Sequence, residues 1–208
     1  KEHDWIIGEV VHYPQENQEG QIAFVKKLGA RKSLTTEMEL ILAEHQLVQE
    51  FPEAVLQEAK KIKKLTPQEI KGREDLRTYP FVTIDGENAK DFDDAIYVKK
   101  TAKGYELWVA IADVSHYVTP HTAMDQEAYA RGTSVYFPHM CLPMLPEKLS
   151  NELCSLKPRQ DRLTFVAKIQ FNAKGKVMGS EFFKAVIRSA ARLTYNEVFK
   201  MLIQGDVE

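Results

Sequence analysis

The sequence Phe81-Val-Thr-Ile-Asp-Gly-Glu-Asn-Ala-Lys-Asp-Phe-Asp-Asp-Ala-Ile-Tyr-Val98 carries four aspartates, at positions 85, 91, 93 and 94, between two apolar runs. The runs 81–84 and 95–98 are rich in β-branched and aromatic residues, which predicts two strands with the aspartates where one ends and the other begins. Gly86 allows a sharp turn directly after Asp85. We therefore expect a loop that gathers carboxylates at the end of two strands.

Carboxylates crowded into one loop raise one another's pKa unless a cation lies between them. Oxygen ligands in this number suit a hard divalent ion such as Mg²⁺, with Mn²⁺ as a substitute, so the four aspartates are candidates for a phosphodiester-cleaving site with one or two ions. An acidic loop can also be a solvated turn without a role. An EF-hand is excluded because Gly86 follows the first aspartate too early. The pair Asp85 and Glu87 leaves a DEDD-type exonuclease as another possibility.

The segment 83–95 closely resembles the signature of the ribonuclease II superfamily, most of all its ribonuclease R branch. The resemblance is dense from about Leu76 to Gly205. It continues in order through residues 107–118, 131–138, 142–146, 149–150 and 153–156. It implies an α+β fold, mainly antiparallel sheet with helices. Three parts are expected: the end of an OB-like cold-shock domain over 1–34, a helical connector over 35–75, and the N-terminal part of an RNB catalytic domain over 76–208.

The resemblance implies a Mg²⁺-dependent exoribonuclease that hydrolyses RNA processively from a single-stranded 3′ end to nucleoside 5′-monophosphates. Asp85, Asp91 and Asp94 are then the expected metal ligands. Asp93 is a ligand or orients the attacking water, and both Asp93 and Asp94 are expected to be catalytic. Bound metal would lower the pKa of that water and neutralise phosphate charge.

Two tyrosines are also candidates. Tyr136, in the segment Thr133-Ser-Val-Tyr-Phe-Pro138, matches an active-site tyrosine of the family that is catalytic and contacts RNA. Tyr195 is implied to contact RNA near a ribose, although a tyrosine at a helix start is commonly a packing residue. The family also uses a downstream arginine and glutamate, a second stacking aromatic and an S1 domain, none of which has a counterpart here. We therefore expect low activity from these 208 residues alone.

A non-catalytic RNA-binding or scaffold protein with the same fold is the competing interpretation. The four aspartates and Tyr136 weigh against it, because a scaffold has no need of mutually repelling acids. Net charge points the other way, since a value of −2 and a pI near 6.4 are not typical of a nucleic-acid-binding protein. Neither observation indicates an oligomeric state.

Composition excludes several other classes. The chain is 44% hydrophobic, enough for a core, but no apolar stretch approaches the roughly 18 residues of a membrane span. The start, Lys1 to Trp5, looks internal and does not resemble a targeting peptide. Cys141 and Cys154 form no Cys-x-x-Cys pair, so we expect buried, free cysteines and a cytoplasmic protein.

Local patterns predict the remaining elements. Alternation predicts three hairpins, over 5–13 with 21–27, 95–100 with 105–112, and 163–171 with 177–187. Capping signals predict helices that start at Thr36, Pro52, Thr66, Thr122 and Thr194. Residues 140–158 are expected to be irregular, and His116 to have a structural role.

Overall fold

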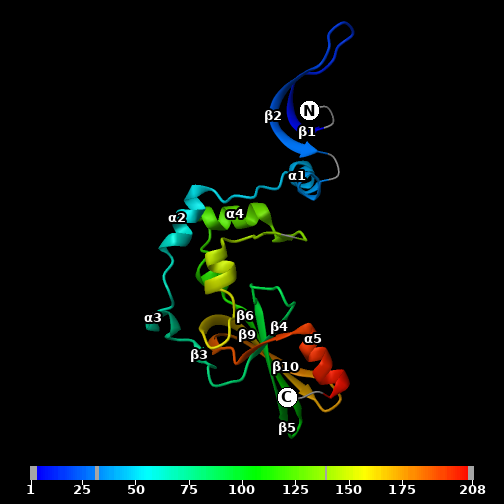
Figure 1. The fold of residues 1–208 in the computed structure, drawn as a ribbon. Coiled ribbons are helices and arrows are strands. Elements are labelled where there is room, and N and C mark those ends of the chain that lie inside the picture. The colour runs from blue at the N-terminus through cyan, green and yellow to red at the C-terminus, as the bar shows by residue number, and fades with distance from the viewer. Residues whose placement is uncertain (1–3, 31–32, 139, 206–208) are drawn as a thin grey trace. The chain divides into compact units, whose positions relative to one another are not determined.

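The structure is a computed structural model that describes residues 4–30, 33–138 and 140–205. The chain forms two compact units that divide between Glu50 and Phe51 (Figure 1). Each described helix is too short or too polar to cross a membrane.

The first unit contains an antiparallel hairpin and one helix. Strands β1 (Asp4–His12) and β2 (Gln21–Ala30) pair antiparallel with three shifts of register along their length. A tight turn joins them where Gln15 and Gln18 exchange backbone hydrogen bonds. This confirms the first predicted hairpin. Two strands do not make a barrel, so the OB-like assignment and the predicted domain limits stay predictions.

The helix of this unit, α1 (Leu34–Glu44), begins earlier than predicted. Its N-cap is Ser33, whose carbonyl accepts a hydrogen bond from the Glu37 amide. Thr36 lies inside the helix, 2% exposed, and its hydroxyl donates to the Leu28 carbonyl of β2. The predicted capping box at Thr36 is therefore wrong, because the hydroxyl bonds the hairpin and not its own helix.

The second unit is built on a seven-stranded sheet of the described residues, in the order β11-β4-β5-β6-β9-β10-β3. All neighbours from β4 to β10 are antiparallel, and only the two outer pairs, β11 with β4 and β10 with β3, are parallel. The expected α+β fold is confirmed. The strands are β3 (Glu74–Asp75), β4 (Val82–Asp85), β5 (Asp94–Thr101), β6 (Gly104–Ala112), β9 (Asp161–Asn172), β10 (Val177–Arg188) and β11 (Ala191–Thr194).

Short helices accompany this sheet. In Figure 1, α2 and α4 lie side by side. Thr66 and Thr194 form capping boxes and Thr122 accepts from the Asp125 amide, so these three predicted helix starts are confirmed. The helices are α2 (Glu53–Lys61), α3 (Pro67–Ile70), η1 (Val114–His116), α4 (Ala123–Arg131), η2 (Lys148–Leu153), α5 (Tyr195–Phe199) and η3 (Lys200–Gln204).

The segment expected to be irregular holds two regular elements. One is η2, a π-helix, and the other is strand β8 (Cys141–Leu142), which pairs with β7 (Val135–Tyr136) in a separate two-stranded ribbon. Both cysteines are free, as predicted. Cys154 is buried but Cys141 is exposed, contrary to expectation, because successive side chains of a strand point to opposite faces and Leu142 takes the buried face of β8.

The core lies on one face of the sheet. Alternate residues of β6, namely Trp108, Ala110 and Ala112, are buried there together with Phe81 and Leu156. This alternation is the period-2 pattern of a strand with one covered face. The other face keeps apolar side chains in solvent, including Ile111, Phe165 and Phe182 at 46%, 46% and 64% exposure.

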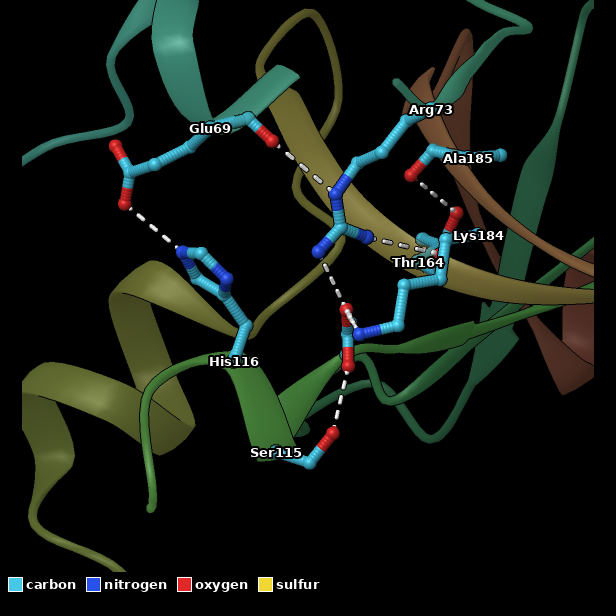
Figure 2. Close-up of polar contacts among 8 residues, drawn as sticks. Glu69, Arg73, Ser115, His116, Thr164, Lys184 and Ala185 are labelled. Atoms are coloured by element: carbon cyan, nitrogen blue, oxygen red, sulfur yellow. Dashed lines mark hydrogen bonds and ion pairs between the residues drawn. The ribbon is translucent and has the colours of Figure 1, made fainter. Parts of the chain in front are cut away.

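A buried polar network ties α3 to the sheet (Figure 2). The Arg73 guanidinium lies 2.6 Å from the Asp113 carboxylate, with the two side chains 7% and 3% exposed. Ser115 donates to the same carboxylate at 2.9 Å, and the Lys184 ammonium lies 3.5 Å from it. His116 contacts Glu69 at 2.8 Å, which gives it the structural role expected of it.

We expect Arg73→Met to destabilise the chain by about 3 kcal/mol, because it leaves the buried Asp113 carboxylate without its principal partner. The double variant Arg73→Met/Asp113→Leu should recover much of that loss, since it removes both charges. Urea unfolding of the three proteins tests this. A double variant no more stable than Arg73→Met would contradict the account.

Stability should also depend on pH through Glu69. A hydrogen bond from the Thr66 hydroxyl, and then one with His116, lowers the pKa of Glu69 from 4.5 to about 2. A carboxyl group with a lowered folded-state pKa stabilises the fold above its unfolded value, and the contribution is lost as the pH falls through the folded value. Glu69→Gln should thus be less stable than the wild type at neutral pH, with the difference shrinking between pH 4.5 and about 2. Unfolding free energies over this range test the prediction, and a constant difference would refute it.

Candidate active site

The aspartates lie where two neighbouring strands of the sheet end and begin, as predicted. β4 ends at Asp85 and β5 begins at Asp94, so residues 86–93 form the connecting loop, the aspartate loop. Phe92 is 8% exposed and belongs to the core, while Asp93 next to it is exposed. A buried apolar side chain near the end of the loop therefore fixes which way the neighbouring carboxylates turn.

The last part of the aspartate loop is fastened by buried hydrogen bonds. The Ser155 hydroxyl, 0% exposed, accepts from the Phe92 amide at 3.1 Å and donates to the Lys90 carbonyl at 2.8 Å. The Leu156 amide donates to the Phe92 carbonyl, also at 2.8 Å. From β6, the Ala112 amide donates to the carbonyl of Asp93 at 2.9 Å. The backbone here is held by segments far away in the sequence.

The carboxylates act on one another as one charge cluster. Burial raises the pKa of Asp85 above its ordinary value, and the Asp94 and Asp91 charges add to this, while Arg192 opposes it. The pKa of Asp93 is also raised, first by the chain packed around it and then by Asp91, Asp94 and Asp85. A raised pKa of this kind is expected for a carboxylate whose negative charge is not compensated by a nearby partner.

The donor set fits a divalent cation. In the described residues no three His, Cys, Asp or Glu side chains form a ready cluster for a metal ion. Mg²⁺ does not require one, because it keeps several waters and commonly takes only one or two protein carboxylates. Asp85 presents a buried Oδ2 atom without a hydrogen-bond partner. An oxygen of this kind beside further carboxylates is suited to a hard cation.

Tyr136 is brought to the aspartate loop by the β7–β8 ribbon. Its hydroxyl donates to Asp91 Oδ2 at 2.7 Å, and this bond is the main reason that the pKa of Tyr136 is raised to about 12. The residue is 67% exposed, so it remains accessible to a ligand. A hydrogen bond from Tyr136 fixes the direction of the Asp91 carboxylate.

Tyr195 reaches the same end of the sheet by another route. Strand β11 pairs with β4, which places Thr194 opposite Asp85, and Tyr195 follows as the first residue of α5. Its side chain is 63% exposed. The tertiary structure thus gathers the six predicted site residues around one end of β4.

Sequence reasoning missed two residues of this region. Ser155 stood in a segment that carried the family resemblance, but nothing in the pattern assigned it a role. No sequence pattern pointed to Arg192. Its Nη2 atom donates to the carbonyls of Gly86 and Glu87 at 2.6 and 2.7 Å, and more than a hundred residues of sequence separate them. Contacts over such separations are not visible in local patterns.

Comparison with known proteins identifies an RNB domain over residues 73–208. The chain belongs to the RNB-domain family. This confirms the predicted resemblance and sets aside the DEDD alternative. Ribonuclease R of Escherichia coli (strain K12) is 47% identical over 203 residues, which cover 97% of this chain and 25% of that protein. The chain therefore spans about a quarter of the length of that RNB-domain relative.

Solved structures agree with the assignment to the RNB-domain family. RNase R from Mycoplasma genitalium in complex with double-stranded RNA superposes with a TM-score of 0.92 at 36% identity, covering 99% of this chain and 37% of the other. A yeast protein described as a pseudonuclease gives a TM-score of 0.77 at 18% identity, covering 97% and 26%. At that identity the second match speaks for the fold alone.

We expect Ser155→Ala to lower the free energy of unfolding by about 1–3 kcal/mol, because it leaves a buried Phe92 amide without its acceptor. Urea denaturation measures this. Ser180→Ala is the matched control, since Ser180 lies on β10 and is exposed. Equal stability of the two variants would show that the hydroxyl does not hold the loop.

Proposed function

We propose that this chain carries the metal-binding part of an exoribonuclease active site, which hydrolyses RNA from a single-stranded 3′ end to nucleoside 5′-monophosphates. The observation that carries the proposal is the aspartate loop of an RNB domain, where the raised pKa values of Asp85 and Asp93 report crowded carboxylates and an exposed tyrosine donates to Asp91. Relatives named ribonuclease R, and a neighbour solved with RNA, support RNA as the substrate. The cytoplasm is the proposed location.

Asp85, Asp91 and Asp94 would hold Mg²⁺, or Mn²⁺ in its place. Bound there, the ion supplies charge neutralisation for the phosphate and a lowered pKa for the attacking water. Asp93 orients that water through a carboxylate oxygen. Tyr136 keeps the Asp91 carboxylate in one direction by its hydrogen bond.

The tyrosines also provide contacts to the nucleic acid. Base stacking on an aromatic ring tolerates any sequence, which suits an enzyme that removes one nucleotide after another. Both side chains are exposed. Tyr136 bonds Asp91, and Tyr195 follows Thr194, which pairs with Asp85. With a net charge of −2, the chain has few uncompensated cations for phosphate contacts, so we propose weak RNA binding and low activity for these residues by themselves.

A non-catalytic RNA-binding module is the second candidate. The observation in its favour is the structural likeness to a yeast pseudonuclease, because it shows that the fold exists outside active nucleases. Folds do not determine function, which depends on the site residues. The aspartate loop and Tyr136 favour the nuclease.

The test is a time course of degradation with 5′-labelled single-stranded RNA. We expect slow shortening from the 3′ end that requires Mg²⁺, at a rate about 10²- to 10³-fold or more below that of a full-length ribonuclease R, because the family resemblance implies further transition-state contacts from outside these 208 residues. Asp93→Asn should remove the activity without changing the fold. The same rate for the wild type and Asp93→Asn, including no cleavage by either, would favour the non-catalytic module.

A further inference from the structure

Arg192 lies beside the aspartate loop on a strand that is distant in sequence. In the parallel pair of β11 and β4, Arg192 stands opposite Thr83 and Thr194 opposite Asp85. Paired residues of neighbouring strands point to the same face of a sheet. The Arg192 side chain therefore shares the covered face with Thr83, which is 0% exposed.

From this position Arg192 spans the first turn of the loop. Its Nη2 atom donates to the Gly86 carbonyl at 2.6 Å and to the Glu87 carbonyl at 2.7 Å. The Gly86 carbonyl also accepts from the Ala89 amide at 3.1 Å, which closes the turn. Charge-assisted bonds of this length are stronger than bonds between neutral groups. One guanidinium thus holds two consecutive carbonyls of the turn that follows Asp85.

Further contacts fix the guanidinium and the turn against each other. The Arg192 guanidinium carbon lies 5.7 Å from the centre of the Phe92 ring, which is the core side chain of the same loop. From α5, the Asn196 amide donates to the Glu87 carboxylate at 2.9 Å. β11 and α5 therefore hold the beginning of the loop, whereas Ser155 and Leu156 hold its end.

Several buried polar atoms of β4 and β11 lack a hydrogen-bond partner among the described residues. Buried side-chain atoms that lack a hydrogen-bond partner in the described structure include Thr83 Oγ1, Asp85 Oδ2 and Arg192 Nε, all on the two strands β4 and β11. Buried polar groups are normally satisfied, and clusters of exceptions occur at functional sites. Arg192 therefore shares this cluster with Asp85, the candidate metal ligand at the end of β4.

We propose that Arg192 is a positioning residue: it fixes the first turn of the aspartate loop and so holds Asp85 and Asp91 at the separation that a divalent ion needs. The part of this proposal that concerns metal binding rests on the proposed function, whereas the hold of Arg192 on the turn does not. The charge of Arg192 and its hold on the loop have opposite expected effects on cation binding. As a neighbouring positive charge, Arg192 weakens cation binding, whereas as a clamp on the loop it strengthens it.

Amide hydrogen exchange of the wild type, Arg192→Gln and Arg192→Lys tests the clamp without any metal. Lysine keeps the charge, but its side chain ends one atom before the guanidinium Nη atoms. We expect exchange at the Ala89 amide to accelerate about tenfold or more in both variants, because a hydrogen bond from a charged donor is lost. Amides of β6 and β9 should not change. Arg188→Gln is the matched control, because Arg188 lies on β10 and pairs with Asp161 of β9, away from the aspartate loop. An unchanged Ala89 amide in Arg192→Gln would overturn the proposal.

Calorimetric titration with Mn²⁺ is the second readout. The clamp predicts that Arg192→Gln and Arg192→Lys both bind Mn²⁺ more weakly, by about three- to tenfold for an ion that needs several aligned oxygen ligands. If charge alone mattered, Arg192→Gln would bind more tightly and Arg192→Lys like the wild type, and either result would overturn the proposal. Absence of Mn²⁺ binding by the wild type would refute the metal site of the proposed function, and the exchange experiment would still decide the role of Arg192.

Discussion

Mutual repulsion of carboxylates is the constraint around which the second unit is organised. Two aspartates in the loop and one at each of its ends would drive its backbone apart if the loop were free in solvent. The loop is instead held at both ends, by Arg192 at Gly86 and Glu87 and by Ser155 at Lys90 and Phe92. Phe92 is buried in the core at the same time. Packing and hydrogen bonds therefore stabilise a charge arrangement that electrostatics opposes.

Two groups of acids in this unit differ in how their charge is compensated. Burial works to raise the pKa of Asp113, but hydrogen bonds from Arg73 and Ser115 overcome it and lower that pKa. The pKa values of Asp85 and Asp93 are raised, because the chain packed around each carboxylate and the neighbouring carboxylates act in the same direction. Acids with satisfied partners hold the fold together, whereas uncompensated acids are characteristic of sites that bind a cation or substrate.

The fold and the site carry different information about function. An antiparallel sheet with the same topology superposes on an RNA-bound ribonuclease R and on a yeast pseudonuclease. The sheet therefore does not distinguish a nuclease from a pseudonuclease. The distinction depends on the side chains at the end of β4, above all on whether the carboxylates, Tyr136 and the segments that position them are present together.

Local sequence determined the features that depend on neighbouring residues. Strand alternation, the capping boxes at Thr66 and Thr194 and the concentration of aspartates are contained in short segments, so patterns were sufficient to predict them. Only the tertiary structure decided what holds the loop. Ser155 and Arg192 reach it from distant segments, and Thr36 bonds a strand and not its own helix. A side chain's partner depends on which segments packing brings together, and that is settled by the burial of the whole sheet and not by any one stretch of chain.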